Sequence, residues 1–118
     1  MKIFLHRWEF DCPCCGENEV QDKLLEWGNS ARVFAGIPFT INSGYRCTRH
    51  NAKVNGSPKS AHLGGWAMDI AAENSVYKFY IVRGLISAGF SRIGIYERFI
   101  HADLDPDKVQ GVIWYGKN

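Results

Sequence analysis

The chain has 118 residues and a mass of 13.4 kDa; 46% of the residues are hydrophobic, 22% are charged, and the formal net charge is +2. This size and composition predict one domain spanning residues 1–118, with enough core to need no disulfide. The charge is too small to indicate a nucleic-acid-binding protein, and no apolar run is long enough to span a membrane.

The first ten residues include His6, Arg7 and Glu9 and contain no apolar stretch like that of a secretory signal peptide. We therefore expect the chain to be made in the cytoplasm, with any export depending on another protein. Residues 1–16 are predicted to form an extended arm and a turn.

Three of the four cysteines, Cys12, Cys14 and Cys15, lie in this arm, and the fourth is Cys47. A structural zinc site normally uses paired Cys-x-x-Cys segments, and Cys47 has no second cysteine near it. Three interpretations stay open: a second zinc ion held by thiols, a disulfide from Cys47 to the N-terminal cluster, or plain buried thiols.

Apolar residues at three- and four-residue steps predict a helix from Glu17 to about Gly36. After it, the sequence predicts a short strand at 39–42, a short helix at 46–54, and a loop rich in Ser, Gly and Pro at 57–65.

The second half of the chain predicts a strand at 67–71 and a helix at 76–88, with Asn74 or Ser75 as its N-cap. Three more strands follow, at 91–96, 99–104 and 112–115. Because these strands succeed one another after a helix, we expect an α+β domain with a small antiparallel sheet and flanking helices.

Two histidines and an aspartate form the main chemical pattern. His62 lies in the glycine-containing loop, Asp69 on the strand that follows, and His101 on a later strand. Two imidazoles and one carboxylate suit Zn²⁺ and leave a fourth position for the water that such an ion activates. Alternation along the later strand places His101 and Asp103 on one face, with Ile100 and Ala102 on the other.

Four segments carry a resemblance to a known family. Ser43-Gly44-Tyr45-Arg46, His50-Asn51, Ser60-x-His62-x-x-Gly65-x-Ala67-x-Asp69 and His101-x-Asp103 together resemble the M15 zinc peptidases. This family contains D-Ala-D-Ala carboxypeptidases and L-alanyl-D-glutamate endopeptidases that cut peptidoglycan stem peptides, and many are phage endolysins. The resemblance implies the zinc fold of hedgehog proteins and D-Ala-D-Ala peptidases.

The resemblance implies a role for each matching residue. His62, Asp69 and His101 match the zinc ligands, and Arg46 matches an arginine that holds the substrate carbonyl or the developing oxyanion. Such a role suits a guanidinium, which is a permanent cation with fixed donors. Ser60 is expected to bind the substrate backbone, or else to cap its own loop, and Tyr45 is expected beside the substrate.

The general base is less clearly marked. Several family members carry a Glu three residues before the last ligand, where this chain has Arg98. Two carboxylates compete for the role: Glu97, in a turn one residue earlier, and Asp103, on the same face as His101. Either could accept a proton from water, and Asp103 could instead orient a ligand; we favour Glu97.

We therefore expect a monomeric zinc peptidase that acts on peptidoglycan stem peptides after release to the cell wall. Two alternatives remain open. One is a non-catalytic domain of the same fold that binds the wall, and the other is a magnesium-dependent hydrolase, although two histidines are unusual ligands for that ion.

Overall fold

The computed structural model describes residues 4–117. The helices are α1 (Asp22–Ala35), α2 (Thr48–Lys53) and α3 (Ser75–Ala88), and short 3-10 turns occur at η1 (Arg7–Phe10) and η2 (Ala61–Gly64). The strands are β1 (Ile41–Ser43), β2 (Ala67–Ala71), β3 (Arg92–Ile95), β4 (Phe99–Asp103) and β5 (Val112–Tyr115). The predicted α+β class is therefore confirmed.

The five strands form one mixed sheet in the order β1-β2-β4-β3-β5, so the prediction of an antiparallel sheet is wrong for one pair. Strands β3 and β5 run parallel, whereas the other neighbours are antiparallel. The reason is that β2 and β3 already occupy both edges of β4. After β4 the chain reverses and adds β5 to the free edge of β3, which places β5 in the same direction as β3.

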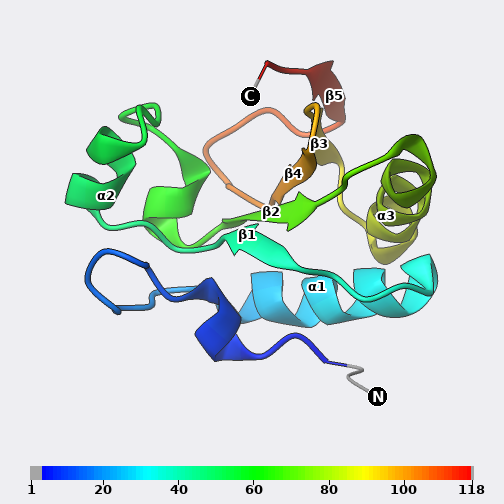
Figure 1. Cartoon of the computed structure of the whole chain (residues 1–118), viewed down its shortest axis with the longest axis horizontal. Helices are drawn as coiled ribbons and strands as arrows, with labels where there is room; N and C mark the ends of the chain where they lie inside the picture. Colours follow the sequence, from blue (N-terminus) through cyan, green and yellow to red (C-terminus); the bar gives the residue numbers. More distant parts are fainter. Residues whose placement is uncertain (1–3, 118) are drawn as a thin grey trace.

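Helices α1 and α3 cover one face of the sheet and enclose the core (Figure 1). Apolar residues of the central strands point towards them, including Met68, Ile70, Ile100 and Ala102, all fully buried. The two helices also touch each other closely. A methyl group added to Gly84 of α3 would lie 2.4 Å from the carbonyl oxygen of Ala31 in α1, so this contact requires glycine.

The opposite face of the sheet carries polar side chains. Because side chains alternate along a strand, Asp69 on β2 and His101 and Asp103 on β4 point away from the helices. The predicted division of β4 is confirmed: Ile100 and Ala102 are buried in the core, and His101 and Asp103 contact each other on the other face. The sheet thus separates a hydrophobic layer from a polar one.

The predicted and observed bounds differ most at helix α1 and strand β1. Helix α1 begins at Asp22, not at Glu17, because the preceding segment is extended: Gln21 N–H donates to the Gly65 carbonyl and Arg7 Nη1 to the Val20 carbonyl. The first strand lies at Ile41–Ser43, one to two residues later than predicted. Of the two predicted caps of α3, Asn74 is the N-cap, and its side chain accepts the Tyr77 N–H.

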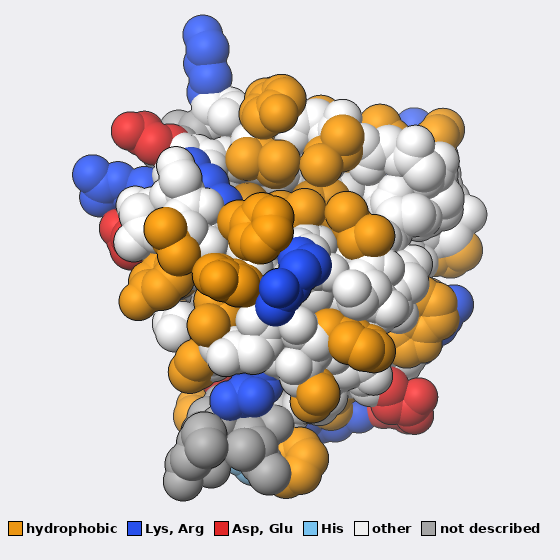
Figure 2. Space-filling view, turned by 90° about the vertical axis from the view of Figure 1, so that its right-hand side faces the viewer, with side chains coloured by type: hydrophobic (Ala, Val, Ile, Leu, Met, Phe, Trp, Pro, Cys, Tyr) orange, Lys and Arg blue, Asp and Glu red, His pale blue; other side chains and the backbone are white. Residues whose placement is uncertain are grey.

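The outer surface of the α3 side is partly apolar. Figure 2 shows hydrophobic side chains scattered over this face among Lys and Arg. Phe79 and Ile86 of α3 are 60% and 57% exposed. Within residues 4–117, no helix combines the length and apolarity that a bilayer span requires.

Candidate metal centre

Strand pairing brings two of the three predicted metal ligands together. Asp69 of β2 and His101 of β4 are direct partners in the antiparallel register. Directly opposite residues have closely spaced side chains on the same face of the sheet. Asp69 Oδ1 lies 2.9 Å from His101 Nδ1. Two residues 32 positions apart in the sequence are therefore held side by side by the sheet alone.

His62 reaches the same point from the short turn η2. The Ser60 hydroxyl caps this turn by accepting the His62 N–H at 3.2 Å, and Gly65 ends it with a left-handed backbone (φ 75°). His62 is buried, and its Nδ1 lies 2.7 Å from the Gly44 carbonyl oxygen. Because a carbonyl can only accept, Nδ1 carries the proton, and Nε2 is left facing Asp69 Oδ2 at 3.3 Å.

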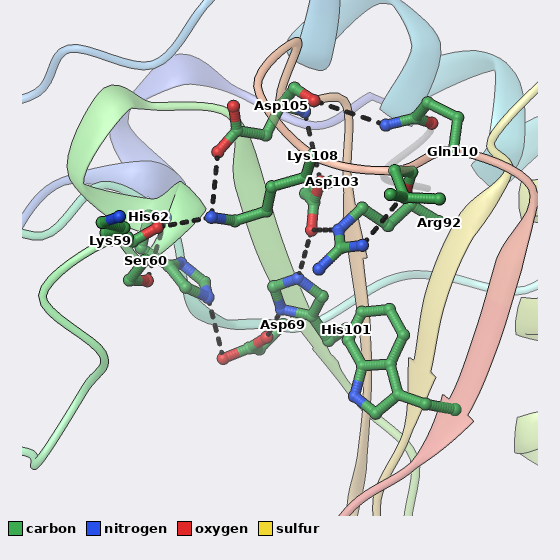
Figure 3. Close-up of polar contacts among 12 residues, drawn as sticks. Lys59, Ser60, His62, Asp69, Arg92, His101, Asp103, Asp105, Lys108 and Gln110 are labelled. Carbon is green, nitrogen blue, oxygen red and sulfur yellow. Dashed lines mark hydrogen bonds and ion pairs between the residues drawn. The ribbon is translucent and has the colours of Figure 1, made fainter.

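Figure 3 shows Asp69 between the two imidazoles and Asp103 on the far side of His101. His101 has Asp69 Oδ1 beside Nδ1 and Asp103 Oδ2 beside Nε2, at 2.9 and 2.7 Å. Ionised carboxylates supply no protons, so the His101 ring must either carry a second proton or share a cation with Asp69.

The donor set fits a zinc ion. One donor atom each from His62, Asp69 and His101 lie within 4.8 Å of one another. Ligand atoms about 2.0–2.2 Å from a tetrahedral zinc ion lie roughly 3.3–3.6 Å apart. The spacing of 3.3 Å between His62 Nε2 and Asp69 Oδ2 already matches that value.

Hydrogen bonds determine the charges of Asp69 and His101. Burial alone would raise the pKa of Asp69, but hydrogen bonds from His101 and His62 outweigh burial and hold this pKa well below its usual range. Burial would likewise lower the pKa of His101, but hydrogen bonds with Asp103 and Asp69 raise it to about 9. Asp69 is therefore ionised at neutral pH, and the His101 ring carries a positive charge beside it.

Asp103 contacts Nε2 of His101, the ring nitrogen that points away from Asp69, and is itself buried. Its side chain is 1% exposed, accepts the Arg92 Nε–H at 3.1 Å, and accepts the Asp105 backbone N–H at 3.1 Å. Burial would raise the pKa of Asp103, but the contacts with His101 and Arg92 and the Asp105 N–H lower it. In metal sites, a carboxylate on the far nitrogen of a histidine fixes the ring and its tautomer.

Arg46 lies at the other side of Asp69. Its Nη2 is 3.5 Å from Asp69 Oδ2, and its Nε and Nη1 donate to Ser43 Oγ and Asn51 Oδ1, each at 3.1 Å. Asn51 is in turn held by donating to the Ser57 carbonyl. The guanidinium is thus fixed beside the three donors.

These groups open into a cleft of about 520 Å³. Arg46, Ser60 and the three predicted ligands line it, together with Tyr96 and Phe99 of the β3–β4 hairpin. Within residues 4–117, the cleft has no lining carboxylate besides Asp69.

Three predicted site residues lie outside this lining: Asp103, which is buried behind His101, and Glu97 and Tyr45. Glu97 is exposed in the hairpin turn, between Tyr96 and Phe99, which do line the cleft. Tyr45 is half-buried, and its backbone N–H donates to the Phe10 carbonyl. Burial and the nearby Glu19 and Glu17 raise the pKa of Tyr45.

Three further residues support the centre, and two of them, Arg92 and Gly94, are not marked by any motif of the sequence. Trp114 of β5 lies 5.6 Å from the His101 ring and donates to the Tyr96 hydroxyl. Arg92 lies over the Trp114 ring at 4.8 Å. Gly94 makes room for this packing, since an added methyl group would lie 2.6 Å from Trp114. Only the alternation of β3, which puts Arg92 and Gly94 on the polar face, could have indicated them.

Comparison with known proteins agrees with this geometry. The model of the Peptidase M15 family matches residues 4–103. The matched span contains Arg46, Ser60, Asp103 and the three predicted ligands. No curated protein gives a significant match to the chain.

Proposed function

The chain belongs to the peptidase M15 family, and from this premise we propose that it hydrolyses a peptide bond in peptidoglycan stem peptides. Zinc would be held by His62 Nε2, Asp69 and His101 Nδ1. When bound, such an ion supplies an activated water and polarises a carbonyl. The observation that carries the proposal is the meeting of these three donors beside Arg46, at the wall of an open cleft.

Arg46 is suited to the carbonyl oxygen of the scissile bond. Its guanidinium is held by Ser43 and Asn51, so it needs no reorganisation when negative charge develops on that oxygen. Ser60 lies on the same wall, and its hydroxyl keeps a free proton to donate while accepting from His62 N–H. It would bind the backbone of the stem peptide.

We assign the two competing carboxylates to different tasks. Asp103 is enclosed by His101, Arg92 and the Asp105 N–H, and it serves to position His101. Glu97 stands on the hairpin whose Tyr96 and Phe99 line the cleft. We infer that this turn brings Glu97 to the bound substrate, where it accepts and returns the proton.

The position of Glu97 also favours a second candidate function. A domain of this family that binds stem peptides without cutting them would need the cleft and Arg46 but no proton acceptor. The Glu97 side chain is outside the lining of the cleft, as such a domain would allow.

Digestion of purified peptidoglycan separates the two functions and identifies the bond. Mass spectrometry of the released muropeptides should show a new peptide terminus that is absent after chelation and returns with added zinc. Binding without any new terminus would support the second function. Loss of a terminal D-Ala would identify a carboxypeptidase, and a free amino group on D-Glu an endopeptidase.

Replacing the proposed proton acceptor tests the mechanism. Glu97→Gln should lower kcat by about 10²–10⁴-fold, because a positioned acid–base group contributes on that scale, while zinc content stays unchanged. Glu73→Gln, an exposed glutamate in the loop before α3, is the matched control. Full activity of Glu97→Gln would remove Glu97 from the mechanism.

A further inference from the structure

A second group of potential metal ligands lies apart from the cleft. The Sγ atoms of Cys12, Cys15 and Cys47 lie within 4.8 Å of one another, and all three thiols are free. Cys12 is buried, Cys47 is half-buried and Cys15 is exposed. None of the three lines the cleft that holds Arg46 and His62.

The chain around Cys12 and Cys15 forms a tight turn. Gly16 N–H donates to the Cys12 carbonyl at 2.8 Å, Cys12 N–H donates to the Glu17 carbonyl at 2.8 Å, and Gly16 has a left-handed backbone (φ 76°). This Cys-x-x-Cys-Gly turn directs both sulfurs to the same side. The Cys-x-x-Cys spacing of Cys12 and Cys15 is present in the sequence, but Cys14 lies between them and makes the pair harder to recognise.

Backbone N–H groups are directed at the sulfurs. Cys47 N–H donates to Cys12 Sγ at 3.5 Å, and His50 N–H donates to Cys47 Sγ at 3.4 Å. The N–H groups of Cys14 and Cys15 also face Cys12 Sγ, and that of Glu17 faces Cys15 Sγ. Such donors favour the thiolate of Cys12, the form that binds metal. At Cys15 the Glu17 N–H acts in the same sense, but burial and the neighbouring Cys12 and Cys47 sulfurs outweigh it and raise the pKa of this thiol to about 11.

We propose that Cys12, Cys15 and Cys47 bind a zinc ion as thiolates, with His50 as the fourth ligand. Zinc–sulfur bonds of about 2.3 Å in a tetrahedron place sulfurs roughly 3.8 Å apart, so the group needs to contract by only about 1 Å. Each thiol releases its proton on binding. The site is structural, because four protein ligands leave no position for water.

His50 is assigned from its place in the fold. It lies three residues after Cys47, the N-cap of α2, and its backbone N–H donates to Cys47 Sγ, so the sulfur lies beside the first turn that carries His50. Residues three apart on a helix are neighbours on one face. His50 is not part of the group of three sulfurs, so ligation requires its ring to rotate towards them.

The ion would join two segments that the site depends on. The N-terminal arm already contacts the segment before α2: Tyr45 N–H donates to the Phe10 carbonyl, and a methyl group on Gly44 would lie 2.6 Å from Phe10 Cα. Gly44 accepts from His62, and Arg46 precedes Cys47 directly. Zinc at the thiols would therefore hold the segment that positions His62 and Arg46.

Metal counting tests the proposal on the full chain. Protein expressed with zinc and purified with a reductant and no chelator should contain two zinc ions per chain by plasma mass spectrometry. Asp69→Ala should keep one, and Cys15→Ser should also keep one. Cys14→Ser, in the same turn but outside the group, is the matched control and should keep two. One zinc in the wild-type chain, and none in Asp69→Ala, would overturn the proposal.

Cobalt substitution keeps the test decisive if Cys15→Ser folds poorly. Asp69→Ala loaded with Co²⁺ should show the near-ultraviolet absorption of thiolate-to-cobalt charge transfer, and His50→Gln should change its visible ligand-field bands. No charge-transfer absorption, or a Cys12–Cys47 disulfide in freshly purified protein by peptide mapping, would refute the thiolate site. An unchanged His50→Gln spectrum would refute the assignment of His50.

Discussion

The two ligand clusters differ in what surrounds them. His62, Asp69 and His101 lie on the sheet and on a capped turn, and their far sides are held by the Gly44 carbonyl and Asp103. The three sulfurs instead lie on loops, where backbone N–H groups are their main partners. The first cluster lines the cleft that holds Arg46, and the three cysteines are not part of that lining.

This difference in surroundings is the reason for proposing a catalytic zinc ion at the His/Asp cluster and a structural one at the sulfur cluster. A catalytic zinc keeps one position open, and its ligands are oriented by further hydrogen bonds. A structural zinc is closed, and its binding energy contributes to folding. We therefore expect mutations in the His/Asp cluster to affect mainly activity and mutations in the sulfur cluster to affect mainly stability. Measuring both quantities for each variant tests this division.

The largest effect on activity is expected from the His/Asp cluster. Asp69→Ala should reduce hydrolysis by at least about 10³-fold, because the ion supplies several kcal/mol of transition-state stabilisation. Circular dichroism should show a folded domain, since the sulfur cluster is intact. Asp107→Ala, an exposed aspartate, serves as control. Near-normal hydrolysis of peptidoglycan by Asp69→Ala would exclude the proposed centre.

A smaller loss is expected at Arg46. Arg46→Lys keeps the positive charge but loses the fork that contacts Ser43 and Asn51. We expect kcat to fall by about 10²–10³-fold, as for removal of an oxyanion donor, with zinc content unchanged. Arg49→Lys, exposed on α2, should behave like the wild type. An increase in KM alone would mean that Arg46 only binds substrate.

The sequence allowed much of this centre to be predicted, for physical reasons. Alternation along β4 separates His101 and Asp103 from Ile100 and Ala102, so the polar face could be inferred from one strand. The strand at 67–71 and the strand at 112–115 were predicted with their observed bounds. Resemblance in the segments around Arg46 and His62 then connected groups that are distant in the chain.

The remaining features depend on tertiary contacts. The parallel pairing of β3 with β5 follows from which strand edges stay free, and no local pattern records this. The meeting of Cys47 with Cys12 and Cys15 depends on how the N-terminal arm packs against Gly44. Our assignment of Asp103 as a support for His101 rests on its burial and on its contact with Arg92, which no local sequence pattern indicates.

An intermediate effect on activity is expected from substitution of Asp103. Asp103→Asn should weaken zinc binding at the His/Asp cluster by about 10–100-fold, the usual cost of losing a carboxylate behind a metal-bound histidine. Activity should fall at limiting zinc and recover when zinc is added in excess. Asp107→Asn is the matched control. A loss of kcat that excess zinc does not restore would instead indicate that Asp103 transfers protons.

The smallest effect on hydrolysis, and the largest on stability, is expected from the sulfur cluster. At a free zinc concentration about 1,000 times Kd, binding stabilises the folded chain by ~4 kcal/mol, so Cys15→Ser should lower Tm by roughly 10 °C or more. Its kcat at 25 °C should fall less than about tenfold, because Ser43, Asn51 and the sheet still hold the cleft. Cys14→Ser should change neither quantity. If Cys15→Ser loses activity as fully as Asp69→Ala while its Tm is unchanged, the two clusters do not divide stability and catalysis between them.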